Sequence, residues 1–364
     1  MVVTVPRMGN TCLAAKAFFE ALHIPYVIPD KVSKKTMQNG AAVSPEEICL
    51  PFKICMGCYD ECISKGADTI LITGSCGPCR FGEYCELQMK LLKKLGHNVR
   101  TIVLDAPSVT GKDEFFKRIG ALTMESRLNK AQKLLALRQA LQILALADKV
   151  DAKAYNLAGY EVNKGECRQL LSACQTEAYR YSRPSDIKAV LMRYIKKLDA
   201  VQTDKNKKPL RLAIIGEIYS MIEPFANLHI EEKLMDYGVS TSRLITPSWW
   251  IHDLVAKPLK INSWTVNKAA SRYLPVNAGG HARESIGHAV LSTRKAYDGV
   301  IQIFPLGCMP EIVVKAIMPR IQKEKDLPVL TLIIDEMTGE AGYITRIEAF
   351  LDMLNARKKK GAYA

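Results

Sequence analysis

The sequence predicts an α/β protein with two parallel-sheet domains and a helical insertion between them. Short apolar runs typical of buried strands alternate with helical patterns in residues 1–110, and again in residues 206–364. That alternation is typical of parallel strands joined by covering helices. Residues 111–205 have helical periodicity without strand-like runs. The length of 364 residues is also about two and a half times a typical domain of roughly 150 residues.

In residues 1–110 the expected strands are apolar runs and the expected helices are amphipathic stretches. Strands are predicted at residues 2–5, 25–28, 68–73 and 99–106. Helices are predicted over 12–23 and 86–96, and a further helix is predicted to begin at Ser44. Ser44 precedes Pro45 and two acidic residues, an order typical of a helix start. Pro51 is expected to break or kink that helix.

A polar, charged stretch at residues 204–209 marks the boundary before the C-terminal domain. Strands are predicted beyond it at residues 211–216, 298–305 and 328–336. Helices are predicted at residues 223–238, 279–297, 310–324 and 343–360. The last helix carries basic residues in its final turns, which suits the negative end of a helix dipole.

The chain is strongly basic, with 51 Lys and Arg against 37 Asp and Glu and a net charge of +14. Such a charge fits a nucleic acid, an acidic membrane surface or a polyanionic small molecule as partner. The basic residues are spread over helices, and no aromatic stacking motif accompanies them, so we expect solvated helix faces and no nucleic acid partner. No apolar run approaches the roughly 18 to 20 residues of a membrane span, and we expect no membrane partner.

Eleven cysteines are unusual for such a chain, and seven of them fall within 37 residues. The seven are Cys49, Cys55, Cys58, Cys62, Cys76, Cys79 and Cys85. The odd total, the length of the chain and the absence of a secretory signal pattern argue against a disulfide framework. We therefore expect a reducing cytoplasm, where clustered thiols bind metal or do redox work.

The segment GSCGPCRFG holds the strongest candidate ligands, because Cys76 and Cys79 come directly after the predicted strand 68–73. Ligands of open parallel sheets collect at the carboxyl ends of strands. Gly74 and Gly77 would let the backbone approach a bound group and point amide N–H groups at anionic sulfur. A lone C-x-x-C is also compatible with half a zinc site or a redox dithiol, although such a dithiol normally opens a helix in a small domain.

Cys49 and Cys308 have comparable settings, because Cys49 lies beside Pro51 and Cys308 lies between a predicted strand and the helix start at Pro310. A thiol at a helix N-terminus is readily a thiolate ligand. Four thiolates from two domains that face each other would suit a metal cluster. Structural zinc sites are usually compact paired C-x-x-C knuckles, so these scattered ligands favour iron–sulfur.

The other cysteines are expected mainly to pack. Cys55, Cys58 and Cys62 share a helical face, where core packing is as good an explanation as ligation. We expect burial as small hydrophobes for Cys12, Cys167 and Cys174, and Cys85 stays undecided.

A glycine-rich loop at the start of the segment 279–297, before its helix, is a second candidate binding element. Gly279, Gly280 and His281 would bind an anion at that helix N-terminus. No G-x-x-x-x-G-K-[ST] motif occurs in the sequence, so we predict that the chain does not itself hydrolyse ATP.

Seven segments carry a resemblance to a known family. They are VPRMGN, PEEICLPFKI, GSCGPCRFGEY, IIGEIYSMIEPFANL, GGHARESIG, DGVIQIFPLGCMPE and IDEMTGEAGYITRIEAFLD. Together they resemble the cluster-bearing proteins of the 2-hydroxyacyl-CoA dehydratase and benzoyl-CoA reductase group. The resemblance is closest to the activase-associated branch, which is related to the double-cubane cluster proteins.

The resemblance implies two flavodoxin-like domains that hold a four-iron four-sulfur cluster, or a linked pair, between them. It implies reduction by a separate ATP-dependent activase with its own cluster, and it suggests homodimers. The family cysteines correspond to Cys49, Cys76 and Cys308, and Cys79 is an additional thiol that would serve as a fourth ligand or as a neighbour. Four protein thiolates would leave no open iron site, which would favour electron transfer over dehydration.

Two functions follow from the resemblance. The first is an enzyme that reduces or dehydrates a small molecule, such as an acyl-CoA. The alternative is a non-catalytic partner that carries electrons or the cluster for the activase. No residue in the sequence identifies an acyl-CoA pocket.

Overall fold

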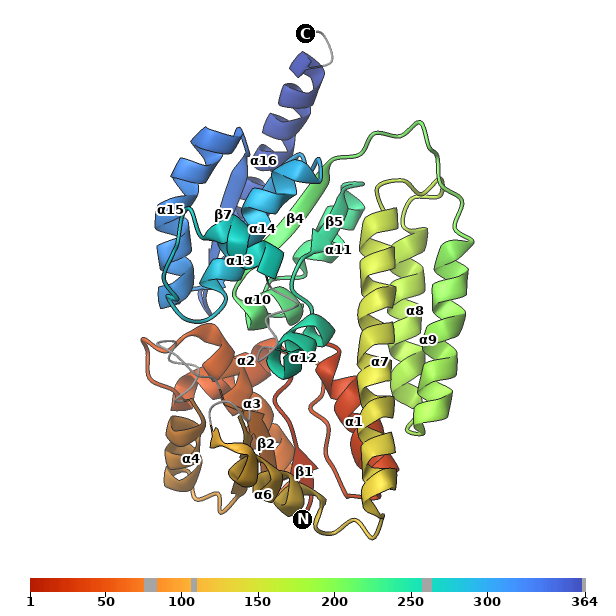
Figure 1. Ribbon diagram of the computed structural model, residues 1–364, viewed down its shortest axis with the longest axis vertical. Coiled ribbons are helices and arrows are strands. Elements are labelled where there is room, and N and C mark those ends of the chain that lie inside the picture. The colour runs from red at the N-terminus through yellow and green to blue at the C-terminus, as the bar shows by residue number, and fades with distance from the viewer. Residues whose placement is uncertain (75–83, 106–109, 257–263, 362–364) are drawn as a thin grey trace. The chain divides into compact units, whose positions relative to one another are not determined.

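The structure, a computed structural model, describes residues 1–74, 84–105, 110–256 and 264–361 (Figure 1). Two parallel sheets, one of three strands and one of four, lie among many helices, which confirms the predicted α/β class with flavodoxin-like domains. Within the described residues, no helix combines the length and the apolar character needed to cross a membrane.

The chain forms two compact units. The first unit holds residues 1–148, 174–193 and 247–260, and the second holds 149–173, 194–246 and 261–364. The helical stretch contains α7 (Lys130–Leu157), α8 (Glu166–Arg180) and α9 (Pro184–Asp199), as its periodicity predicts. The predicted boundaries at residues 110 and 205 stay predictions.

The sheet of the first unit contains β1 (Val3–Thr4), β2 (Thr69–Thr73) and β3 (Arg100–Leu104), in that order and all parallel. The predicted strand 25–28 is wrong, because only Tyr26 forms an isolated parallel bridge, to Val3. Pro25 and Pro29 enclose this segment, and proline cannot donate to a ladder, so the pairing stops after one bridge. The bridge still places residue 26 on the side of β1 away from β2.

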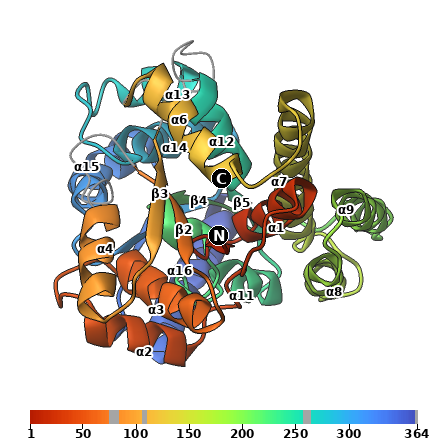
Figure 2. The ribbon, with the colours of Figure 1, turned by 90° about the horizontal axis from the view of Figure 1, so that it is seen from below.

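Among the described residues of this part of the chain, five helices follow or cover the sheet. They are α1 (Thr11–Leu22), α2 (Lys34–Val43), α3 (Leu50–Ser64), α4 (Tyr84–Lys94) and α6 (Lys112–Thr123). Figure 2 shows α2 packed on the outer side of α3. The two backbones touch there, since a Cβ on Gly40 would lie 1.8 Å from the carbonyl oxygen of Lys53.

The predicted helix start at Ser44 is wrong. Ser44 is the C-cap of α2, whose own start is fixed by a capping box between Ser33 and Thr36. The next helix begins only at Leu50, and Pro51 lies in its first turn. Proline is tolerated there because the first-turn N–H groups have no partner within the helix, so Pro51 starts the helix rather than kinking it.

The sheet of the second unit has four parallel strands in the order β5-β4-β6-β7. They are β4 (Arg211–Gly216), β5 (Ser240–Arg243), β6 (Gly299–Pro305) and β7 (Val329–Ile334). The sequence does not predict β5, whose residues STSR are polar. Its backbone pairs with β4 along four residues, and Ser240 and Thr241 are buried. Here pairing with the neighbouring strand outweighs weak strand propensity.

The helices of the C-terminal part complete the layers. They are α10 (Ile218–Ile222), α11 (Ile230–Asp236), α12 (Pro247–Ala256), α13 (Trp264–Ala270), α14 (Ala282–Arg294), α15 (Met309–Lys325) and α16 (Glu340–Gly361). A core cluster packs α14 and α15 on the sheet through side chains such as Ile286, Val314 and Ile215. The predicted helix 223–238 is too long, because α11 begins only at Ile230.

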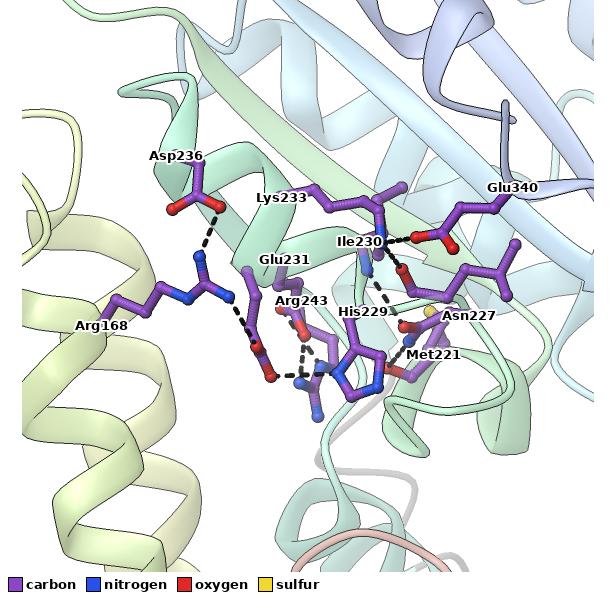
Figure 3. Close-up of polar contacts among 12 residues, drawn as sticks. Arg168, Met221, Asn227, His229, Ile230, Glu231, Lys233, Asp236, Arg243 and Glu340 are labelled. Atoms are coloured by element: carbon purple, nitrogen blue, oxygen red, sulfur yellow. Dashed lines mark hydrogen bonds and ion pairs between the residues drawn. The ribbon is translucent and has the colours of Figure 1, made fainter. Parts of the chain in front are cut away.

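A polar network explains the late start of α11 (Figure 3). Leu228 and His229 both have left-handed backbone conformations, which interrupt a helix. The Asn227 amide donates to the carbonyl of Ser220 at 2.9 Å, and its oxygen accepts from the N–H of Ile230 at 3.3 Å. Lys233 donates to the carbonyl of Leu228 at 2.6 Å. These side chains hold the turn in place of helical hydrogen bonds.

The same network contains a buried ion pair and an exposed one. Arg243 of β5 pairs with Glu231 of α11, and both side chains are almost fully buried. Arg168 of α8 pairs with Asp236 and Glu232 at the surface (Figure 3). Breaking a buried pair leaves an uncompensated charge, whereas an exposed pair contributes little.

We predict that Arg243→Met lowers the free energy of unfolding by about 3 to 5 kcal/mol, because Glu231 is left as a buried unpaired carboxylate. Chemical denaturation measures this value. Arg168→Met is the matched control, and its expected loss is no more than about 1 kcal/mol. Equal losses in the two variants would contradict the assignment of Arg243 and Glu231 as a buried pair.

Candidate functional site

The sheet of the second unit changes winding direction at its first strand, and the Tyr26 bridge gives the first unit a similar arrangement around β1. In the second unit β4, the first strand, lies between β5 and β6. In the first unit β1 lies between the Tyr26 bridge and β2. The connections on the two sides of such a first strand diverge and leave a crevice at its carboxyl end, which is where open α/β sheets bind ligands. The sites to examine are therefore the ends of β4 and β6, and the ends of β1 and β2.

Cys308 lies where the prediction places it, between the end of β6 and the start of α15. The turn passes through Gly307 with φ +78°, and the N–H of Cys308 donates to the carbonyl of Pro305 at 3.1 Å. Cys308 is the N-cap of the 17-residue helix α15 and is 8% exposed. The positive end of a helix dipole favours the thiolate form at this position.

The structure brings the glycine-rich loop to the same helix start. Gly280 has φ +50°, and a Cβ there would lie 3.1 Å from the ring of Pro310. His281 is the N-cap of α14, and its carbonyl accepts from the N–H of Ser285 at 2.8 Å. Gly280 and Cys308, predicted from separate parts of the sequence, thus flank one contact between two helix N-termini.

A buried carboxylate fixes these two helices, and sequence reasoning missed it. Glu311 of α15 is 1% exposed. It accepts from the Ser285 hydroxyl of α14 at 2.7 Å and from the Gln302 amide of β6 at 2.8 Å. Thr331 of β7 donates to the Gln302 oxygen at 3.1 Å. An acidic residue in the first turn of a helix is ordinarily explained by its favourable interaction with the helix dipole. The sequence therefore does not indicate that Glu311 is buried.

Glu217 adds a second carboxylate at the end of β4. It is the N-cap of α10, and it accepts from the N–H groups of Tyr219 and Ser220 at 2.9 and 2.8 Å. Burial raises the pKa of Glu217. Burial also raises the pKa of Glu311 to about 7; hydrogen bonds from Gln302 and Ser285 act in the opposite direction, and the charge of Glu217 raises it further. The carboxyl edge of this sheet therefore holds two interacting acidic groups.

In the first unit Gly74 ends β2 against Asp105, which follows β3. A Cβ on Gly74 would lie 1.8 Å from an Asp105 carboxylate oxygen, so a close approach accounts for this glycine. Arg118 of α6 in turn pairs with Asp105 at 3.1 Å. Cofactor binding by Gly74 stays a prediction. Cys76, Gly77 and Cys79 lie outside the described residues.

Cys49 is the N-cap of the 15-residue helix α3. Its sulfur is in hydrogen-bonding contact with the hydroxyl of Tyr84, the first residue of α4. The Tyr84 ring is buried and meets Phe52 edge-on, with centroids 5.0 Å apart. Tyr84 also comes directly after the segment that contains Cys76 and Cys79. The fold thus places Cys49 beside the chain that leaves this segment.

Six of the remaining thiols are buried, whereas Cys85 is half-buried and stays undecided, and the choice between packing and ligation stays open for Cys55, Cys58 and Cys62. Cys12, Cys167 and Cys174 are buried, as are the three thiols on one side of α3, Cys55, Cys58 and Cys62. Burial raises the pKa of Cys62 to about 11, which disfavours its thiolate form.

Cys49 and Cys308 each cap a long helix of their own unit, and Cys49 has a hydroxyl partner, so each thiol by itself has a setting that suits a thiolate ligand. Across residues 1–74, 84–105, 110–256 and 264–361, no three or more His, Cys, Asp or Glu side chains are grouped to hold a metal ion. The role of Cys76 and Cys79 as ligands stays a prediction.

The raised pKa of Glu311 predicts a pH dependence of stability. The ordinary carboxyl value is 4.5 and the folded value is about 7, so the folded state holds the proton more tightly. Its contribution is fully present below the lower value and is lost as pH rises to the upper one. At about 1.4 kcal/mol for each pH unit, the loss is on the order of 3 kcal/mol.

We predict that Glu311→Gln removes this dependence. The variant's free energy of unfolding, relative to the native chain, should therefore rise between about pH 4.5 and pH 7.5. Urea denaturation across this range measures it, and Glu86→Gln on the exposed side of α4 controls for loss of a charge as such. A constant difference between the native chain and Glu311→Gln would show that folding does not raise the pKa of Glu311.

Comparison with known proteins identifies one family. Residues 7–244 match the profile of the CoA enzyme activase uncharacterised domain (DUF2229), and no curated protein is significantly similar to the chain. The match agrees with the activase-associated resemblance at a coarse level, whereas the double-cubane branch stays a prediction. The matched region begins after β1, covers β2 to β5 and includes Cys49, Cys76 and Cys79. Because it spans well over half of the chain, the protein belongs to the CoA enzyme activase uncharacterised domain family.

Proposed function

We propose that this chain is an iron–sulfur protein that receives low-potential electrons from an ATP-dependent activase. It passes them to a small molecule, for which a CoA thioester is the leading class. The description of its family as a CoA enzyme activase domain supports an activase-related role. The absence of a P-loop motif from the sequence supports ATP hydrolysis by a separate protein.

The observation that carries the proposal is the matching position of the cysteines in the two sheets. Cys76 and Cys79 follow β2, and Cys308 follows β6. Each of these strands lies next to the first strand of its sheet, at the crevice where such sheets bind ligands. We assign Cys49, Cys76, Cys79 and Cys308 as ligands of a four-iron four-sulfur cluster or a linked pair.

When bound, the cluster supplies one-electron transfer. The chain supplies thiolates at helix N-termini, where the dipole stabilises their charge. The Tyr84 hydroxyl contacts the Cys49 sulfur, and hydrogen bonds to ligand sulfur raise a reduction potential. Glu311 lies in the first turn of the helix that Cys308 caps, and a negative charge there would lower the potential. These opposing groups are the means by which this chain would tune electron uptake.

The ligand assignment predicts that Cys308→Ala and Cys76→Ala each abolish the cluster, because a thiolate bond to iron is lost. Anaerobic purification followed by iron and acid-labile sulfide assays and electron paramagnetic resonance measures cluster content. Cys167→Ala is the matched control, since that buried thiol is expected only to pack. Iron-free native protein that has never met air, or full cluster content in Cys308→Ala, would overturn the assignment.

A further inference from the structure

The first unit has an apolar surface that no part of the proposed function uses. Among the described residues, large apolar side chains gather on the outside of α6 and the first half of α7, and Leu134 and Met124 are 67% and 66% exposed. The members of this surface on α7 are Leu134, Leu137 and Leu141, whereas the exposed Leu135 lies about 100° around the helix from Leu134, beyond Arg138. Contiguous exposed apolar side chains at this density typically mark an interaction site.

These leucines form a second apolar side of α7. They are spaced three and four residues apart, so they share one side of the helix. The opposite side carries Ala136, which belongs to the same core cluster as Phe19 and Leu22 of α1. Figure 2 shows α1 beside α7. The core therefore already covers one apolar side, and the leucine side is additional.

Met124 extends this surface. Lys133 in the first turn of α7 donates to the carbonyl of Thr123, the last residue of α6, at 2.8 Å. Leu122 of α6 and Ala136 of α7 also pack into the same core cluster. The end of α6 thus lies against the start of α7. We define the α7 leucine face as Met124, Leu134, Leu137 and Leu141.

Along α7 the charges around this face have one sign, and Glu125, which follows Met124, pairs with the N-terminal amine at 3.1 Å. Residues 126–147 contain Arg127, Lys130, Lys133 and Arg138 and no Asp or Glu. Arg138 follows Leu134 by four residues and precedes Leu141 by three, so a cation borders the leucines directly. A second copy of this chain would bring cations against cations, and like charges beside a helix pair oppose association.

We propose that the α7 leucine face docks an amphipathic helix of a partner protein whose flanks are acidic. Leucines spaced three and four residues apart match the seam of a two-helix contact. The basic border selects acidic flanking residues and steers their approach. The face is a narrow line interrupted by Arg138, which suits a helix better than the broad apolar side that inserts into a lipid surface.

The test uses two synthetic peptides of four heptads with leucine at the a and d positions. One carries Glu at e and g, the other carries Lys. Fluorescence anisotropy should show the acidic peptide binding the full chain at least about tenfold more tightly than the basic one, with affinity falling as salt rises. Leu137→Asn with Leu141→Asn, and separately Arg138→Glu, should each weaken the acidic peptide by about tenfold or more.

Leu306→Asn is the matched control, because Leu306 is an exposed leucine of the second unit and should leave binding unchanged. Circular dichroism confirms that each variant keeps its helix content, and Arg138→Glu tests the same face if the double variant misfolds.

Equal affinity for both peptides, or unchanged binding by the variants, would overturn the proposal. A dimer in sedimentation velocity that the leucine substitutions dissociate would overturn it in favour of a second copy. Leucine-dependent cosedimentation with phosphatidylserine vesicles would overturn it in favour of a lipid surface.

Discussion

In the second unit the strand that comes first in the chain, β4, lies inside the sheet with later strands on both sides, and in the first unit β1 pairs with β2 and carries a single bridge to Tyr26 on its other side. This order constrains everything at the carboxyl edge. The connections that leave β4 and β6 must part to opposite faces, and the backbone ends between them cannot be covered by either connection. Glu217 and Cys308 occupy those two ends in the second unit. In the first unit the corresponding ends lead into α1 and into the segment with Cys76 and Cys79. The order of the strands therefore determines where along the chain these carboxyl and thiol groups occur, whatever the neighbouring side chains are.

The second unit stabilises this edge with a buried carboxyl group, which is unfavourable when it is charged. Glu311 accepts hydrogen bonds from neutral donors on α14 and β6. These bonds orient its carboxyl group, but the donors carry no positive charge that would neutralise it. A carboxylate in that setting is costly when charged, and the nearby Glu217 adds to the cost. The gain is that β6, β7, α14 and α15 share one hydrogen-bonded chain of side chains. This chain of hydrogen bonds fixes the helix starts at His281 and Cys308 relative to one another.

Sequence patterns predicted the apolar strands well, because β4 and β6 are buried runs and β7 is a largely apolar run bounded by polar residues. They failed where contacts between distant parts of the chain, or neighbouring prolines, outweighed the local sequence preference. Ser44 and Pro45 look like a helix start, yet Ser44 closes α2 and Pro51 opens α3. Residues 25–28 are apolar but lie between prolines, and β5 is polar but paired. The position of Cys308 between a strand end and a helix start was predictable from the surrounding glycine and proline, whereas the role of the candidate cysteines as ligands stays a prediction. Glu311 was not predictable, since its burial arises from contacts with residues far away in the sequence.

The approach of α2 to α3 gives Cys49 its fixed position. A Cβ on Gly57 would lie 1.9 Å from the carbonyl oxygen of Thr36, so these two helices meet at backbone distance with no side chain between them. The short connection from Ser44 to Cys49 is thereby tied at both ends to one rigid helix pair. Its conformational entropy is lost when the protein folds rather than when a ligand arrives. The thiol at the start of α3 is thus preorganised, and binding energy at that sulfur need not be spent on ordering a loop.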